Sequence, residues 1–223
     1  MATHTRLFSS SIGMKLAIGL TGLAMVGFLV EHMVGNLLLL VGPDAYNGYA
    51  DVLISNPFVI PAELGLVAIL GIHVYKAVRN YGANRAARPT RYAVKRAAGH
   101  TSRKSTASTS MIVTGAVILA FLILHLRTFK YGPHYLVDGT EVRDLYRLVI
   151  EVFAQPSYAA FYVLSMILVA MHLYHGVASA FQSLGIDGPR ATPWLLGLGQ
   201  ALAIIMGAGF ALIPMWILMR TLS

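Results

Sequence analysis

Five long apolar segments constrain the fold of this chain more than any other feature of its sequence. An α-helix needs about 20 apolar residues to cross the ~30 Å hydrocarbon core of a bilayer. Only 12% of the 223 residues are charged, whereas an ordinary soluble domain has about 25% charged residues. We therefore predict an all-α integral membrane bundle that forms one domain over residues 1–223. Its predicted transmembrane helices cover residues 14–41, 58–80, 108–129, 156–184 and 193–219.

The charges between these segments predict how the bundle is oriented. The connection over residues 82–106 carries seven lysine or arginine residues and no acid, whereas residues 42–56 carry two aspartates and no basic residue. Because basic connections stay in the cytoplasm, we expect the N-terminus and residues 82–106 on that side and the C-terminus outside. The basic connection suits anionic lipid headgroups, a soluble partner with an acidic face, or both. Apolar residues at helical spacing between Glu141 and Phe153 predict a short amphipathic helix outside the membrane.

Histidines within the apolar segments are the strongest functional signal, because ionisable side chains inside a membrane are costly and commonly functional. At a rise of about 1.5 Å per residue, His32 and His125 lie ~25 Å from the cytoplasmic face. By the same measure, His73 and His172 lie ~23 Å from the opposite face. Four consecutive predicted helices therefore supply two pairs at two depths. We call His32 and His125 the outer pair, and His73 and His172 the inner pair; His4, His100 and His134 fall in predicted loops.

Two pairs of histidines on four helices are the arrangement that bis-histidine haem b requires, because two imidazoles from opposed helices bind one iron along one axis. We predict one haem b for each pair. A metal site made of histidines alone would need about three or four ligands at one depth. His175 lies one helical turn after His172, so spacing leaves both open as ligands, and we choose His172 because its depth matches His73. The chain has no cysteine, which excludes thiolate and iron–sulfur ligation by this chain.

Cationic and polar side chains near the two pairs are candidates for contacts with haem propionates and with a quinone. The propionate candidates, which could equally extend to the lipid–water interface, are Lys76 and Arg79 near the inner pair and Arg127 and Lys130 near the outer pair. The quinone candidates are Tyr75, His175 and Ser179 near the inner pair and Asn36 and Glu31 near the outer pair. The sequence does not choose the side. Glu63, near the outer end of the second segment, either reaches the interface or accepts protons from a quinol.

Four stretches around these histidines resemble the cytochrome b subunit of succinate:quinone oxidoreductases, in its single-anchor, two-haem class. They read EHMVGNLLLLVGPDAYN, GIHVYKAVRNYGA, LHLRTFKYG and MHLYHGVASAFQSLGI. The resemblance implies that His32 and His125 bind the distal haem and that His73 and His172 bind the proximal haem. Some members of this family carry a glutamate, linked to transmembrane proton transfer, two residues before the fourth-helix ligand. This chain has Ala170 at that position.

The same resemblance implies a function in the respiratory chain and the tricarboxylic acid cycle. The chain would be the electron-transfer anchor of succinate dehydrogenase (complex II) in the cell's inner, cytoplasmic membrane. A flavoprotein with covalent FAD and an iron–sulfur protein would bind on the cytoplasmic face, and menaquinone would be the quinone. Two alternatives remain. One is the cytochrome b anchor of another membrane-bound dehydrogenase or a hydrogenase. The other is a haem-free transporter, which is disfavoured because no internal repeat is evident.

Overall fold

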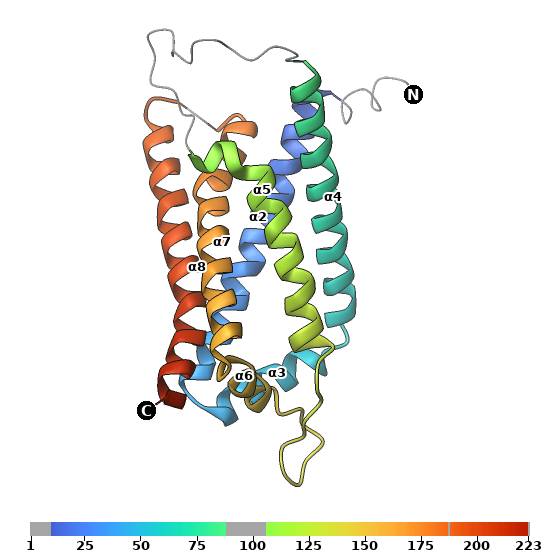
Figure 1. Ribbon diagram of the computed structural model, residues 1–223. Coiled ribbons are helices and arrows are strands. Elements are labelled where there is room, and N and C mark those ends of the chain that lie inside the picture. The colour runs from blue at the N-terminus through green and yellow to red at the C-terminus, as the bar shows by residue number, and fades with distance from the viewer. Residues whose placement is uncertain (1–9, 88–105, 187, 223) are drawn as a thin grey trace.

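Long helices form the whole bundle in the computed structural model, which describes residues 10–87, 106–186 and 188–222 (Figure 1). Five helices of this part of the chain are long and apolar enough to cross a membrane. These are α2 (Ser11–Leu37, continued by η1, Leu38–Leu40), α4 (Val59–Ala86), α5 (Thr106–His125, continued by the π-helical turn η2, Leu126–Lys130), α7 (Pro156–Ser183) and α8 (Ala191–Leu222). The described residues contain no β-strand. The protein is therefore an all-α, multi-pass membrane protein, and the five predicted spans are confirmed to within a few residues.

Local sequence determines where several helices begin. The Ser10 hydroxyl accepts a hydrogen bond from the Gly13 amide (3.0 Å) at the start of α2, and the Asp144 carboxylate accepts one from the Arg147 amide (3.0 Å) at the start of α6 (Leu145–Phe153). These side chains satisfy amides that have no partner within the helix. Proline opens α7, at a position where its missing N–H costs nothing.

Four of the five long helices form a square in which α2, α4, α5 and α7 follow one another around the bundle axis. Each contacts its two neighbours in this order, and α7 closes the square against α2. In Figure 1, α5 lies in front, α2 behind it, α4 to the right and α7 to the left. The diagonally opposite helices are therefore α2 and α5 in one direction, and α4 and α7 in the other.

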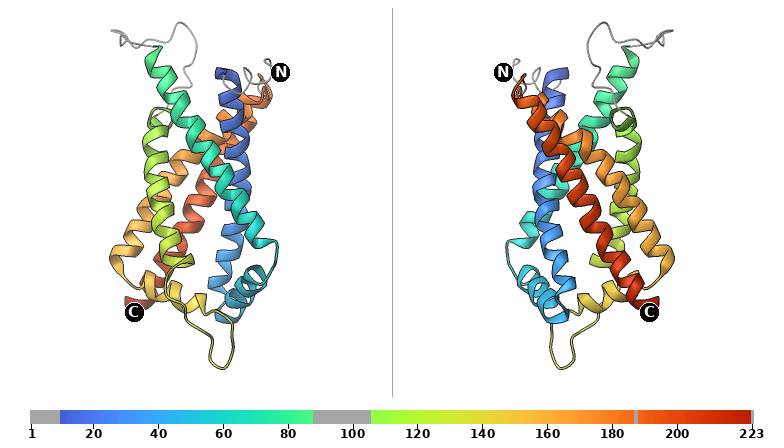
Figure 2. Two further views of the ribbon diagram at one scale, coloured as in Figure 1. Left: turned by 90° about the vertical axis from the view of Figure 1, so that its right-hand side faces the viewer. Right: turned by 90° about the vertical axis from the view of Figure 1, so that its left-hand side faces the viewer.

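The fifth long helix, α8, packs outside this square against α7 (Figure 2, right). The two helices approach closely because Gly207 of α8 faces Ala170 of α7, where a Cβ atom on Gly207 would lie 2.8 Å from the Ala170 Cβ. Position 170 thus faces α8. On the other side of the molecule α4 packs mainly on α2, and none of its residues is buried (Figure 2, left).

A cap closes one end of the bundle, the end at which α8 finishes and opposite to the start of α2 (Figure 1). It consists of α3 (Pro43–Ile54), a hairpin-like loop over residues 131–144 and α6. Helix α6 confirms the predicted amphipathic helix, although it begins at Leu145 because residues 136–143 pair in the loop instead. Helix α3 was not predicted. The basic connection lies mostly outside the described residues, which resume at Thr106, and His4 and His100 lie outside them as well.

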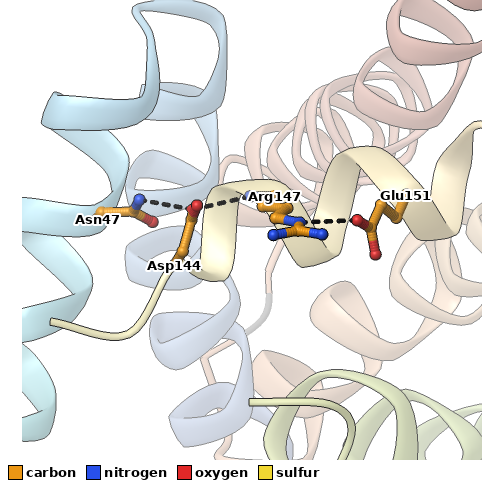
Figure 3. Close-up of polar contacts among 4 residues, drawn as sticks. All are labelled: Asn47, Asp144, Arg147 and Glu151. Carbon is orange, nitrogen blue, oxygen red and sulfur yellow. Dashed lines mark hydrogen bonds and ion pairs between the residues drawn. The ribbon is translucent and has the colours of Figure 1, made fainter. Parts of the chain in front are cut away.

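Polar contacts hold the cap together (Figure 3). Asn47 of α3 is 5% exposed; its amide donates to the Asp144 carboxylate (2.8 Å), and its carbonyl oxygen accepts from the Tyr146 amide (2.8 Å). On the exposed face of α6, Arg147 forms an ion pair with Glu151 (2.8 Å). Hydrogen bonds from Arg147 and Tyr135 lower the pKa of the Glu151 carboxyl. Asn47 therefore joins α3 to the first turn of α6 from a buried position.

Candidate cofactor site

The outer pair lies near the cap, where α2 and α5 bring two imidazoles together across a diagonal of the square. The ring centroids of His32 and His125 are 5.8 Å apart and their planes are nearly perpendicular, at 85°. Aromatic rings surround both imidazoles: Phe28, Phe121, Phe129, Tyr162 and Phe210. The two rings therefore meet in apolar surroundings that exclude water.

The inner pair uses the other diagonal, with His73 on α4 and His172 on α7. Each ring is held through its Nδ1 atom by a threonine of a neighbouring helix. Thr21 of α2 lies 3.1 Å from His73 Nδ1, and Thr114 of α5 lies 3.1 Å from His172 Nδ1. With Nδ1 engaged in this way, the Nε2 atom of each ring is left for a ligand.

The separation of the two pairs along the bundle axis can be estimated on α2 and α5, because Thr21 and Thr114 lie beside the inner pair on the helices that carry the outer pair. His32 follows Thr21 by eleven residues, and His125 follows Thr114 by eleven residues. At about 1.5 Å per residue this is ~16 Å. The depths estimated from sequence predict the same two levels.

An internal repeat underlies this arrangement and escaped the sequence analysis, so the absence of a repeat no longer counts against a transporter. Residues 21–32 read TGLAMVGFLVEH and residues 114–125 read TGAVILAFLILH, with the same residue at five of twelve positions. The segments that follow, HVYKAV from His73 and HLYHGV from His172, share three of six residues. Helices α2 and α5 run in the same direction (Figure 1), so a rotation of about half a turn around the bundle axis relates the two halves. Aligning the four histidine segments with one another would have found this repeat.

The residues present fit a haem in three respects. With metal–nitrogen bonds of about 2 Å, two imidazoles on opposite sides of one ion have ring centroids ~6 Å apart, close to the 5.8 Å of the outer pair. Gly22 and Gly115 lie against the inner pair, where a Cβ atom would be 3.3 Å from His73 Cε1 and 3.4 Å from His172 Cε1.

A buried cation near the outer pair is the third respect. The guanidinium of Arg143 donates to the carbonyl oxygens of Phe129 (2.9 Å) and Pro133 (3.3 Å), while its Nε atom is buried without a hydrogen-bond partner. No carboxylate of the described residues forms an ion pair with it. Burial lowers the pKa of the Arg143 guanidinium. Arg143 donates to the carbonyl oxygen of Phe129, whose ring packs directly on His125. The unsatisfied Nε–H of Arg143 is therefore near the outer pair and suits an anionic group such as a propionate.

The candidates near the inner pair divide into two groups. Tyr75 is 55% exposed, and its hydroxyl accepts a hydrogen bond from Arg79 (3.3 Å). Lys76 and Arg79 both lie over the Tyr75 ring, so these three side chains interact with one another on α4. On α7, His175 and Ser179 are half-buried and lie one and two helical turns beyond His172, and His175 interacts electrostatically with His172. Only the α7 group therefore stays beside the pair.

The candidates near the outer pair are also separated by the fold. Asn36 donates to the His32 carbonyl oxygen (2.7 Å) and accepts from the Tyr46 hydroxyl (3.2 Å), which links α2 to the cap. Glu31 is exposed on α2 beside His32. In the π-helical turn that follows His125, Arg127 is exposed and Lys130 forms an ion pair with Glu63 of α4. Lys130 is thus engaged with a carboxylate. Arg143, a partly buried cation that the sequence analysis missed, donates to the backbone of Phe129, whose ring packs on His125.

Comparisons with known proteins do not identify a relative. No protein-family model matches the chain, and no curated protein or solved structure matches it at a significant level.

Proposed function

We propose that this protein is the membrane anchor and electron-transfer subunit of a succinate:quinone oxidoreductase, and that it holds two haems b. The observation that carries the haem proposal is the convergence of four histidines from four helices into two diagonal pairs. Each pair takes one residue from each half of the internal repeat. Lone histidines that merely bridge neighbouring helices would have no reason to pair across both diagonals of the bundle.

Each part of the haem environment has a candidate in this chain. A bis-histidine haem supplies one-electron transfer when bound. His32 and His125 would hold the outer haem, and His73 and His172 the inner one. The aromatic rings of the outer pair keep water away, and hydrogen bonds to Nδ1 orient the rings of the inner pair. Arg143 offers its buried Nε–H to a propionate of the outer haem.

The partners are proposed from the sequence resemblance. A flavoprotein with covalent FAD and an iron–sulfur protein would bind at the cytoplasmic end of the bundle, next to Lys76, Arg79 and the basic connection. Electrons from succinate would then reach menaquinone directly or through the two haems, in the inner membrane of the cell. A quinone near the outer pair would meet Asn36 and Glu31, and one near the inner pair would meet His175 and Ser179.

The first test counts haem b in the complex purified in mild detergent. We expect two haems per chain, one of which is lost in His32→Ala or His125→Ala and the other in His73→Ala or His172→Ala. His175→Ala is the matched control, because it removes an imidazole one turn from His172 on the same helix and should retain both haems. A wild-type protein without Soret absorbance would refute the haem proposal and favour a transporter.

The second test identifies the partner subunits. We expect covalent flavin and succinate:quinone reductase activity to copurify with the chain. Two haems together with nickel or molybdenum, and without covalent flavin, would contradict the succinate proposal and indicate the anchor of a hydrogenase or another dehydrogenase.

A further inference from the structure

We propose that Thr21 and Thr114 are positioning residues that hold the inner-pair histidines in one tautomer, with Nε2 as the free base, and thereby tune the inner haem. This proposal rests on the proposed haem function and goes beyond it, because it assigns a role to two residues that do not touch the iron. The two threonines occupy equivalent positions in the internal repeat, and each is followed by the glycine against which the histidine ring packs.

The direction of these hydrogen bonds follows from counting protons. A threonine hydroxyl has one proton. Thr21 Oγ1 lies 2.6 Å from the Ala17 carbonyl oxygen, and Thr114 Oγ1 lies 3.1 Å from the Ser110 carbonyl oxygen. In the proposed arrangement each hydroxyl donates its proton to this carbonyl oxygen of its own helix. The oxygen can then only accept from the imidazole. The Nδ1 atoms of His73 and His172 therefore carry the proton, and their Nε2 atoms carry the lone pair that an iron needs.

The two inner histidines differ in how many hydrogen-bond acceptors lie near Nδ1. His73 Nδ1 lies 3.2 Å from the Ile18 carbonyl oxygen as well as 3.1 Å from Thr21. This backbone acceptor would keep the proton on Nδ1 if Thr21 were replaced. His172 Nδ1 has Thr114 as its only acceptor in the described part of the chain, and Thr114 itself is 3% exposed. Replacing Thr114 should therefore have the larger effect.

The outer pair provides an internal reference. No hydrogen bond joins the His32 ring to another described residue, and His125 Nδ1 lies 3.4 Å from the Tyr162 hydroxyl, beyond the usual range for a strong hydrogen bond. Neither outer histidine contacts Thr21 or Thr114. A substitution of either threonine should thus change one haem and leave the other unchanged.

The expected effect is a shift in midpoint potential. An acceptor on Nδ1–H makes Nε2 a stronger electron donor, which favours the ferric haem. Thr114→Val keeps the side-chain shape but removes the acceptor, so the inner haem should lose part of its ferric preference. A three- to tenfold loss corresponds to an upward shift of about 30–59 mV for a one-electron couple. Thr21→Val should give a smaller shift in the same direction.

The experiment is a potentiometric titration of both haems in the intact complex, combined with haem counting and low-temperature EPR of the ferric state. Thr114→Ser retains the hydroxyl and should restore the wild-type potential and EPR signal, which a loss of packing alone would not explain. Thr221→Val is the matched control, because Thr221 donates to the Ile217 carbonyl oxygen (2.9 Å) in the same way without contacting a histidine. It should leave both potentials unchanged.

Three results would overturn the inference while leaving the haem proposal intact. These are two haems with unchanged potentials in Thr114→Val, equal shifts of both haems, and a larger shift for Thr21→Val than for Thr114→Val. If Thr114→Val does not assemble, the other two variants test the inference. Thr114→Ser must match the wild type, and Thr21→Val must shift the midpoint potential of the inner haem alone. Absence of haem from the wild-type protein would instead refute the proposed function itself.

Discussion

Replacing Asn47 by alanine should loosen the cap by releasing α6 from α3. Asn47 is buried, and its side chain makes one hydrogen bond to the Asp144 carboxylate and accepts one from the Tyr146 amide, both at 2.8 Å. The substitution removes both bonds at once. It also leaves Asp144 as the sole remaining cap of the first turn of α6, through the Arg147 amide.

The size of the effect follows from the two bonds. A neutral hydrogen bond contributes about 0.5–1.5 kcal/mol to stability, and one to a charged group contributes about 1.5–3 kcal/mol. Their sum is roughly 2–4.5 kcal/mol in the free energy of opening α6. Because about 1.4 kcal/mol corresponds to a factor of ten, amide hydrogen exchange in α6 should accelerate roughly 30- to 1,600-fold.

Hydrogen exchange measured by mass spectrometry on the protein in detergent would test this expectation peptide by peptide. The acceleration should be confined to residues 145–153 and the adjoining loop, while α3 itself should not exchange faster, because alanine is a better helix former than asparagine. Glu151→Gln is the matched control on the same helix. It breaks an exposed ion pair with Arg147, which solvent screening makes weak.

Two outcomes would refute this reasoning. Unchanged exchange over residues 145–153 in Asn47→Ala would show that the buried hydrogen bonds do not hold α6. An effect of Glu151→Gln as large as that of Asn47→Ala would show that the surface ion pair holds it instead.

Three further predictions concern other contacts. Ala170→Leu should destabilise the protein by about 1–3 kcal/mol through overpacking against Gly207, and unchanged thermal melting in detergent would contradict the close α7–α8 approach. Glu63→Gln breaks the ion pair with Lys130, in which the two side chains are 43% and 38% exposed. The free energy of unfolding from thermal melting should therefore change by less than about 1 kcal/mol. A larger loss would mean that this ion pair holds α4 against the bundle. Arg143→Met should lower the potential of the outer haem alone, because losing a positive charge favours the ferric form. An unchanged potential in a redox titration would place the guanidinium away from any propionate.

The five transmembrane helices and the depth of each histidine could be predicted from the sequence alone. Both are local properties in a membrane, because a spanning segment must satisfy every backbone hydrogen bond within its own helix. Length and apolarity then suffice to define a span, and a constant rise per residue converts position into depth. For this reason the sequence places His32 and His125 at one depth, and the structure brings the centroids of their rings to 5.8 Å from each other.

Which side chains face the histidines could be seen only in the three-dimensional structure. Depth is independent of the rotation of a helix about its axis, so it could not show that Tyr75 and Arg79 contact each other on an exposed part of α4. It could not show that Arg143, a loop residue, is folded back to the level of Phe129 either. The threonine partners of His73 and His172 lie 52 and 58 residues away in the chain. Such contacts depend on how helices pack together, and packing is a property of the whole bundle and not of any one segment.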